Sequence, residues 1–441
     1  MLSFLAQIPS QHYSADEVAA PYIYVFYAAF IVAFCFTPVM QMVASYYGII
    51  DEPDNKRKLH SAPVAYLGGV AVFLGWISGM AISQFLSLHR TEPGLLPHLK
   101  VPFSIIIGAS VIVLLGLWDD IQHISPKVKI GGQMFAALCL LLEGVGIRCT
   151  GPMLVPVFSR LEHLLQINIL AHPLFPYFVY ITSALLVIGA IVGCCNATNL
   201  MDGLDGLCGG VTAIIAAGFL FLAIHLAMFG GGMNSNWDAL RVVLGFALLG
   251  AILGFIPYNF NPASIFMGDT GSMFLGYSCG TLIILLAQER PKWFLAAMVI
   301  FALPVLDTVL AFARRYVAGR PIFQADRFHF HHQLLARGMT VRRAVIVIYL
   351  IAIGFAVLGG AIVFMRTRYA VAIYLVIFGS IVVAAYKMGM VHERPRVVKA
   401  GGIDADEHVT PTEEIDPSGV LEIEDPRKRS GERAGGAAPI T

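Results

Sequence analysis

Long runs of apolar residues recur along most of the chain, and they limit the fold more than any other feature. A membrane-spanning helix needs about 20 apolar residues, because each residue adds about 1.5 Å along the helix axis. Eleven runs approach this length, at residues 22–44, 65–86, 102–117, 129–146, 176–194, 210–229, 239–256, 272–288, 293–312, 344–364 and 370–387. The sequence therefore predicts an all-α polytopic membrane protein with about 11 transmembrane helices.

The composition supports this class and argues against others. Of the 441 residues, 57% are hydrophobic and 13% are charged, whereas soluble domains are about 25% charged. The formal net charge of +1 gives no basis for nucleic-acid binding, and the seven cysteines lack the spacing of zinc ligands. We expect an extracytoplasmic segment at 1–21, a transmembrane domain at 22–390 and a disordered cytoplasmic tail at 391–441, which has few large apolar residues.

Lysine and arginine in the loops indicate the orientation. One set of loops carries more of them, mainly between residues 313 and 343, and such loops face the cytoplasm. The N-terminus is then outside, and five polar clusters all fall on the cytoplasmic side. They are DEPDNKRKLH (51–60), WDDIQHISPKVK (118–129), CCNATNLMDGLDGLCGG (194–210), NPASIFMGDTGS (261–272) and DRFHFHHQLLARG (326–338). We expect them to converge on one site in the middle of the bundle. Membrane lipids surround this bundle and are expected partners.

Two of these clusters offer carboxylates. Asp119 and Asp120 are adjacent at the end of an apolar run, so a cation or a retained proton must offset their repulsion; a solvated acidic helix end is the alternative. Lys127 and Lys129 follow closely and could bind an anionic substrate or serve only as positive-inside residues. Asp269 lies in GDTGS at a helix start, where it could cap the helix or hold Mg²⁺ against a phosphate.

Two further clusters offer amides and imidazoles. Asn196, Asn199, Asp202 and Asp205 are three residues apart, which predicts that they follow one side of a helical segment and read a sugar or a base; a polar turn is the alternative. His329, His331 and His332 lie near Arg327, which suits a diphosphate better than zinc. An interfacial polar loop remains the plain interpretation. His60 follows a basic run and is a weaker candidate.

The five clusters, in this order, resemble the polyprenyl-phosphate N-acetylhexosamine-1-phosphate transferases of bacteria, glycosyltransferase family 4. That family includes the WecA/TagO-type GlcNAc-1-phosphate transferases and the phospho-MurNAc-pentapeptide translocase. The resemblance covers roughly residues 20–390 and rests on KRKLHSAPVAYLGG, GLWDD, NATNLMDGLDGL, FMGDTGSMFLG and DRFHFHHQLLARG. It implies a Mg²⁺-dependent reaction, with Mn²⁺ as a substitute. A polyprenyl phosphate, usually undecaprenyl phosphate, attacks the β-phosphate of a UDP-sugar and releases UMP.

The resemblance also implies roles for individual residues. One aspartate of the 119–120 pair deprotonates or positions the lipid phosphate, and Asp269 with Asp119 binds the metal. The remaining matches are Asn199, Asp202 and Asp205 near the metal and nucleotide, Phe266 against uracil, and Arg327, His329, His331 and His332 at the diphosphate and sugar. The spelling HFHHQLL resembles the GlcNAc branch, which predicts UDP-GlcNAc as donor and a product that starts cell-envelope polysaccharide synthesis. The implied location is the bacterial inner membrane, and homodimers are common in the family.

Several alternatives remain open at this point. The donor could be another UDP-aminosugar or UDP-MurNAc-pentapeptide. A secondary transporter would place its polar residues near the bilayer midplane, not in loops at one face. A CDP-alcohol phosphatidyltransferase needs further aspartates after DGLDG, and residues 207–222 contain none. A non-catalytic scaffold would not need the acids.

Overall fold

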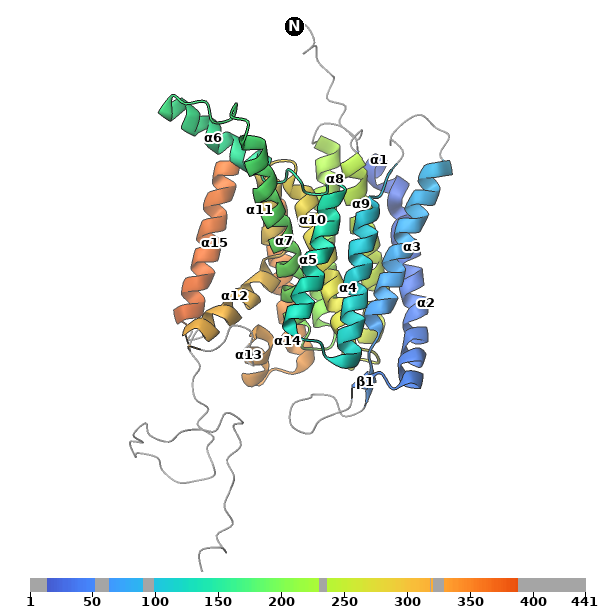
Figure 1. Ribbon diagram of the computed structural model, residues 1–441. Helices are drawn as coiled ribbons and strands as arrows, with labels where there is room; N and C mark the ends of the chain where they lie inside the picture. The colour runs from blue at the N-terminus through green and yellow to red at the C-terminus, as the bar shows by residue number, and fades with distance from the viewer. Residues whose placement is uncertain are drawn as a thin grey trace, which may run out of the picture. The chain divides into compact units, whose positions relative to one another are not determined.

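The apolar runs form helices that pass alongside one another between two ends of a bundle (Figure 1). This computed structural model describes residues 14–51, 63–89, 99–229, 236–317, 319 and 329–387. The expected tail at 391–441 lies outside the described residues, as do residues 1–13. The elements are α1 (Ala15–Ala19), η1 (Ala20–Tyr22), α2 (Ile23–Tyr47), β1 (Ile50–Asp51), β2 (Val64–Ala65), α3 (Gly68–His89), α4 (Phe103–Gln122), α5 (Pro126–Leu142), α6 (Gly151–Leu165), α7 (Phe175–Met201), α8 (Leu207–Phe229), α9 (Asn236–Asn259), α10 (Gly268–Ala287), α11 (Pro291–Ile300), α12 (Ala302–Val317), α13 (Phe330–Ala336), α14 (Val341–Ile362) and α15 (Thr367–Lys387).

The described residues confirm fewer membrane spans than the sequence predicts. Among the described residues, eight helices are long and apolar enough to cross a membrane, or nine if the bent pair α11 and α12 is one span. Helix α5 has 17 residues, and the apolar part of α15, Thr367–Ser380, is also short. All 11 predicted ranges fall on helices. The structure therefore confirms an all-α polytopic membrane protein but not the count of 11.

Helix α10 is the centre of the bundle. It packs against α7, α4, α3, α9 and α11, and its apolar window is completely buried inside the protein. Such a helix must have both ends satisfied by protein groups, because neither lipid nor bulk water surrounds it. The carboxylate of Asp120 on α4 accepts hydrogen bonds from the N-terminal amides of α10. Arg241 of α9 donates to the carbonyl oxygen of Leu285, near the C-terminus of α10.

The break between α11 and α12 turns the chain by 72°. It lies at Phe301, three residues before Pro304. Because proline lacks an N–H group, Pro304 cannot donate to the carbonyl of Ile300, and helices commonly bend at such positions. The bend carries the second half of the predicted run 293–312 sideways, toward the lower end of α15 (Figure 1).

The polar clusters gather at one end of the bundle, the lower end in Figure 1. At this end β1 pairs antiparallel with β2, with Asp51 opposite Val64. Ala65 also forms a bridge to Ile265 in the loop between α9 and α10. Residues far apart in sequence are thus held together where α4, α7 and α12 end and α5, α10 and α13 begin.

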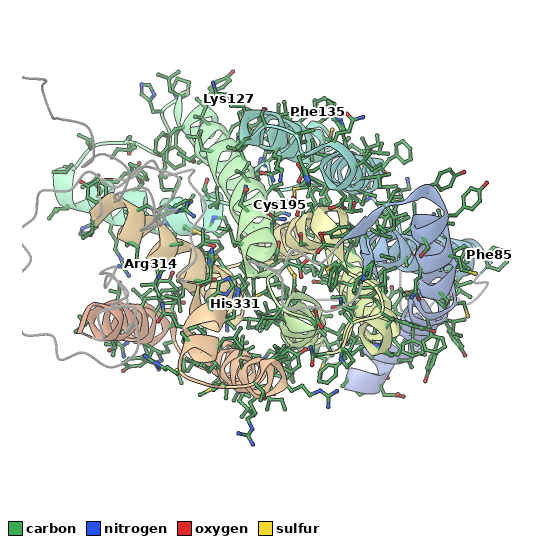
Figure 2. All side chains as sticks on the ribbon, turned by 90° about the horizontal axis from the view of Figure 1, so that it is seen from below. Phe85, Lys127, Phe135, Cys195, Arg314 and His331 are labelled. Atoms are coloured by element: carbon green, nitrogen blue, oxygen red, sulfur yellow. The ribbon has the colours of Figure 1, made fainter. Side chains whose placement is uncertain are left out.

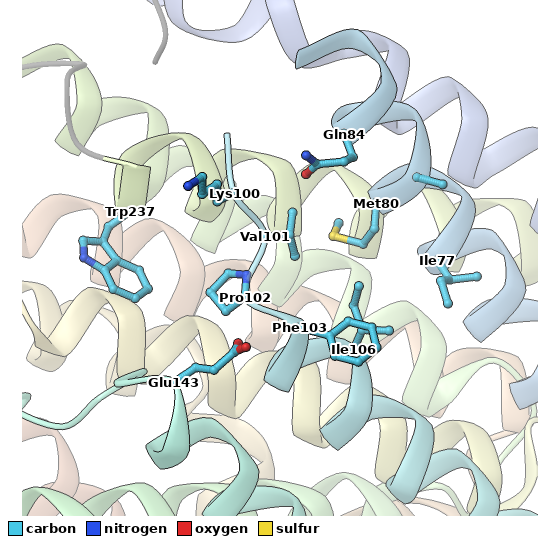
Figure 3. A pocket seen from close by; sticks show the side chains of 11 residues that line it. Ile77, Met80, Gln84, Lys100, Val101, Pro102, Phe103, Ile106, Glu143 and Trp237 are labelled. Carbon is cyan, nitrogen blue, oxygen red and sulfur yellow. The ribbon is translucent and has the colours of Figure 1, made fainter. Parts of the chain in front are cut away.

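The opposite end carries two features that the sequence analysis did not predict. Helix α6 has no buried residue and lies across the bundle end at an angle to the spans (Figure 1). A pocket of about 810 Å³ lies between α3, α4 and α9 (Figure 3). Met80, Val101 and Ile106 form part of its apolar lining, and Lys100 and Glu143 contribute its charges. This pocket is separate from the polar clusters.

Candidate active site

The acids of α4 and α10 meet around one lysine. Lys129, on the first turn of α5, forms ion pairs with Asp119 and with Asp269, the latter at 2.7 Å between Nζ and Oδ2. Asp119 is 5% exposed, and its other oxygen accepts a hydrogen bond from the amide of Ile124 at 2.9 Å. The sequence predicted that a cation or a retained proton offsets the repulsion of the 119–120 pair, and Lys129 is the cation beside Asp119.

Asp120 has a different set of partners from its neighbour. Its oxygens accept from the amides of Asp269 at 2.7 Å and Thr270 at 3.1 Å, and from the Thr270 hydroxyl at 2.6 Å. Negative charge at a helix N-terminus is favourable because it meets the partial positive charge of the unpaired amides. Asp120 therefore fixes the first turn of α10, and the amides that could have received a phosphate are already bonded.

The asparagine–aspartate cluster is only half helical. Helix α7 ends at Met201, so Asn196 and Asn199 lie on the helix while Asp202 and Asp205 lie beyond it. The prediction that all four follow one side of a helical segment was wrong. Gly203 and Gly206 instead support a turn, in which Gly206 takes a φ of +75°.

The four side chains accordingly do different things. Asn199 donates to the Ser272 hydroxyl on α10 at 3.0 Å. Asn196 donates to Gln133 of α5 at 2.7 Å, one turn farther from the loop. Asp205 accepts from Asn261 and from the amide of Ala263, and so fixes the loop before α10. These contacts bring Asn199 and Asp205 to the site's framework and place Asn196 between helices.

Asp202 combines burial with nearby negative charge. Removal from water, followed by the charges of Asp269, Asp120 and Asp205, raises the pKa of its carboxyl group to about 8. A carboxylate in such a position favours a bound proton or a cation. The carboxyl group of Asp202 can therefore hold either a proton or a cation.

Phe266 forms an aromatic surface beside the loop. Its ring centroid lies 5.9 Å from that of Tyr66, at an interplanar angle of 57°. Backbone hydrogen bonds from Phe266 to Ala65 and from Gly68 to Phe266 hold the two segments together. Burial and the charge of Asp51, to which the Tyr66 hydroxyl also hydrogen bonds, raise the pKa of that hydroxyl. Tyr66 was not among the predicted site residues.

The histidine loop, residues 329–332 at the start of α13, is anchored by an aspartate of α12. One oxygen of Asp307 lies 2.9 Å from Nδ1 of His329, and the other accepts from the Phe330 amide at 2.9 Å. His331 is 2% exposed, and its Nε2 has no hydrogen-bond partner among the described residues. A Cβ atom added at Gly203 would lie 2.4 Å from this nitrogen, so His331 lies against the DGLDG turn. His332 is exposed, with its ring 4.2 Å from that of His331.

One other predicted site residue, Lys127, is not brought together with this group. Lys127 is exposed and lies at the edge of the bundle in the view of Figure 2, whereas His331 lies inside it. His60 and Arg327 lie outside the described residues. The lysine that joins the site is Lys129, two positions after Lys127.

The donor set favours a hard cation that takes few protein ligands. Among the described residues, no three His, Cys, Asp or Glu side chains are grouped to hold a metal ion, which does not fit a structural zinc site. Asp119 and Asp269 already share one cation, the Lys129 ammonium. Two carboxylates of this kind, completed by substrate oxygens, fit the way Mg²⁺ is commonly bound.

Asp307 and Tyr66 were not singled out from the sequence, although the sequence held a signal for Asp307. Asp307 is a lone acid within the apolar run 293–312, and an ionisable residue at membrane depth is by itself a functional candidate. Lys129 was considered together with Lys127, and nothing in the sequence separated either from an ordinary positive-inside residue, because lysines near a span are common on the cytoplasmic side.

Comparison with known proteins agrees with this geometry. A family model described as glycosyl transferase family 4 matches residues 102–287. The chain is 32% identical over 386 residues to the probable undecaprenyl-phosphate N-acetylglucosaminyl 1-phosphate transferase of Bacillus subtilis (strain 168), covering 86% of this chain and 95% of that protein. It is 33% identical to the decaprenyl-phosphate N-acetylglucosaminephosphotransferase of Mycobacterium tuberculosis (strain ATCC 25618 / H37Rv), covering 81% and 85%. It is also 28% identical to the undecaprenyl-phosphate alpha-N-acetylglucosaminyl 1-phosphate transferase of Escherichia coli (strain K12), covering 72% and 77%.

Proposed function

Since the chain belongs to the polyprenyl-phosphate N-acetylglucosaminyl 1-phosphate transferases of glycosyltransferase family 4, we propose that it uses UDP-GlcNAc as the donor, in a Mg²⁺-dependent reaction. The enzyme transfers GlcNAc-1-phosphate to polyprenyl phosphate. The observation that carries the proposal is the pairing of Asp119 and Asp269 around one cation position, next to the DGLDG turn and the histidine loop.

The reaction is a phosphoryl transfer. An oxygen of the lipid phosphate forms a bond to the β-phosphorus of the donor, and the bond from that phosphorus to the bridging oxygen breaks. UMP leaves with the bond electrons, and the lipid carries a diphosphate ending in GlcNAc. Such reactions depend mainly on positioning and on neutralising phosphate charge.

The chain's own residues divide this work. Asp119 lies beside Lys129 and Asp269 and faces the cation position, whereas Asp120 is bonded to the start of α10. Asp119 is therefore the member of the pair placed to position or deprotonate the acceptor. Asp119 and Asp269 would hold Mg²⁺, for which Mn²⁺ could substitute, and the ion would neutralise diphosphate charge. Lys129 would then be released toward a phosphate oxygen.

The other side chains supply recognition. Phe266 offers a ring for the uracil base. Asn199 donates to Ser272, near Asp269 on α10, and Asp202 is close enough to Asp269 to be affected by its charge. Nε2 of His331 packs against the DGLDG turn and has no hydrogen-bond partner among the described residues. We place this site on the cytoplasmic face of the bacterial inner membrane, where UDP-sugars are available. The homodimer stays a prediction.

The first test is a donor assay on the purified full-length protein. The assay supplies undecaprenyl phosphate, Mg²⁺ and UDP-GlcNAc, and measures UMP together with the lipid-linked sugar; UDP-MurNAc-pentapeptide and an EDTA sample run in parallel. We expect UMP release when UDP-GlcNAc is the donor and not when UDP-MurNAc-pentapeptide is. We expect no UMP release from the sample with EDTA. Turnover only with the MurNAc donor would overturn the choice of sugar. No UMP from any UDP-sugar, with folded protein, would overturn the transferase.

An Asp269→Asn variant tests the metal assignment. Loss of one metal carboxylate should lower kcat on the order of 100-fold, while the thermal midpoint of the metal-free protein changes little. Asp238→Asn is the matched control, because Asp238 is also a buried acid paired with a cation, Arg241, but on α9 away from the site. Wild-type turnover in Asp269→Asn would exclude this carboxylate as a metal ligand.

A further inference from the structure

Asp307 holds two neighbouring residues of the histidine loop with one side chain. It belongs to α12, shortly after the 72° bend between α11 and α12. Its Oδ2 lies 2.9 Å from Nδ1 of His329 and its Oδ1 accepts from the Phe330 amide at 2.9 Å. Asp307 is 7% exposed and His329 is 5% exposed, so water competes little for either hydrogen bond.

We propose that Asp307 is a positioning residue of the transferase, which keeps a proton on Nδ1 of His329 and thereby aims the histidine loop at the donor substrate. This inference rests on the proposed function for the identity of the donor. It assigns a role to a residue of α12 that lies outside the five sequence motifs.

The proton position follows from what a carboxylate can do. An ionised carboxylate only accepts hydrogen bonds, so the nitrogen that faces Asp307 must carry the hydrogen. His329 then keeps Nε2 for other partners. As a neutral ring it accepts there from a sugar hydroxyl or amide group, and as an imidazolium it donates there to a phosphate oxygen.

The position of His329 is passed on to His331. The two rings are parallel within 4° and their centroids are 5.8 Å apart. Nε2 of His331 is buried without a partner among the described residues. A Cβ atom added at Gly203 would lie 2.4 Å from this nitrogen, so the DGLDG turn packs directly against the His331 ring. The position of His329 therefore also affects how His331 meets this turn.

A purely structural role for Asp307 predicts a different result from a positioning role. Asp307→Asn keeps the size of the side chain. Its carbonyl can still accept from Phe330, and its amide can donate to Nδ1 of His329. The hydrogen-bond geometry would survive, but the imidazole proton would move to Nε2. The variant therefore separates the shape of the anchor from the proton position that it imposes.

The experiment compares wild type, Asp307→Asn and Asp238→Asn as full-length protein in detergent. We expect kcat/KM for UDP-GlcNAc to fall about 10- to 100-fold in Asp307→Asn, with the KM for undecaprenyl phosphate unchanged within about twofold. Asp238→Asn, which neutralises a buried acid away from the site, should keep wild-type kcat/KM. If folded Asp307→Asn matches the wild type, the positioning role is wrong.

Histidine NMR gives a second result that does not depend on turnover. Protein labelled with ¹³C and ¹⁵N in histidine, with His329→Gln used to assign the signal, should show the Nδ1–H form of His329 in the wild type and the Nε2–H form in Asp307→Asn. An Nε2–H form in the wild type would overturn the inference. Failure of the proposed function would look different, because the wild type would then release no UMP from any donor while the NMR still reports the proton position.

Discussion

At the scale of single residues, the candidate site depends on which polar side chains of α4, α5 and α7 face the first turns of α10. Asp119, Asp269 and Asn199 were identified because carboxylates and amides are costly beside apolar runs, and the structure brings them to one network. Lys127 and Lys129 could not be separated in advance. Residues two apart on a helix face different directions, and which one faces α10 depends on how α5 is rotated in the bundle.

Asp120 and Asp205 show the same limit. Both are acids at the site, yet their oxygens accept from backbone amides of α10 and of the loop before it. A sequence gives no sign of which carboxylates will bind backbone and which will face a substrate, because this depends on helix ends brought together by tertiary packing. The lone acid Asp307 could have been found by its apolar surroundings.

The buried imidazole of His331 predicts how acid affects stability. Burial, followed by the charge of His332, lowers its pKa from 6.5 to about 3. The unfolded chain then takes up a proton near pH 6.5 that the folded protein excludes. The stability that the neutral ring contributes is complete above pH 6.5 and is lost as the pH falls toward 3. We expect the thermal midpoint of His331→Gln to fall less than that of the wild type between pH 7 and pH 5. Parallel midpoint curves for both proteins would contradict a depressed pKa.

At the scale of elements, hydrophobic periods located the helices and left their ends undetermined. Each predicted span falls on a helix, because about 20 apolar residues leave few other structures in a membrane. The polar ends depended on local events. Helix α7 ends at Met201, and Asp202 takes a non-helical ψ of 63° that breaks the predicted helical register. Helix α6 was missed because its apolar residues alternate with Arg160, Glu162 and His163, and so do not form a continuous run.

Close packing of backbones explains how α10 brings Asp269 to the site. A Cβ atom added at Gly69 of α3 would lie 2.1 Å from the amide nitrogen of Gly271, and one added at Gly116 of α4 would lie 2.4 Å from the Cα of Thr270. Three helices therefore touch at the first turn of α10. A larger residue at either glycine would have to move backbone, which cannot adjust as a flexible side chain can.

Gly69→Ala tests this contact. We expect it to lower the stability by about 1–3 kcal/mol and also to reduce turnover, because the shift moves Asp269 away from Lys129. Gly189→Ala on α7 is the matched control, since nothing lies within 4 Å of its added Cβ and alanine favours a helix by about 0.5–1 kcal/mol over glycine. Thermal unfolding and UMP release would be measured for both. A Gly69→Ala protein as active and stable as the control would show that α3 and α10 are not in this close contact.

At the scale of the whole molecule, the two ends of the bundle are built for different purposes. One end gathers the acids, Lys129 and the histidine loop. The other buries Arg241 completely, with Asp238 and Glu289 each at 2.6 Å, where it satisfies the C-terminus of α10. Helix α10 thus has the anion Asp120 at its start and the cation Arg241 at its end, as the helix dipole favours. Its first turn, with Asp269, lies at the end of the bundle that holds the candidate active site.

The loop charges predict that the site end faces the cytoplasm, and labelling can test it. Lys127→Cys introduces a thiol at the site end, and His163→Cys introduces one on α6 at the other end; both positions are exposed. The parent chain is the control, because six of its cysteines are buried and Cys35 lies within α2. In intact cells a membrane-impermeant maleimide should label His163→Cys at once and Lys127→Cys only after permeabilisation. Lys127→Cys should also keep wild-type turnover, because Lys127 lies apart from the acids. The reverse labelling pattern would place the site outside the cell, away from any UDP-sugar, and would contradict both the orientation and the choice of donor.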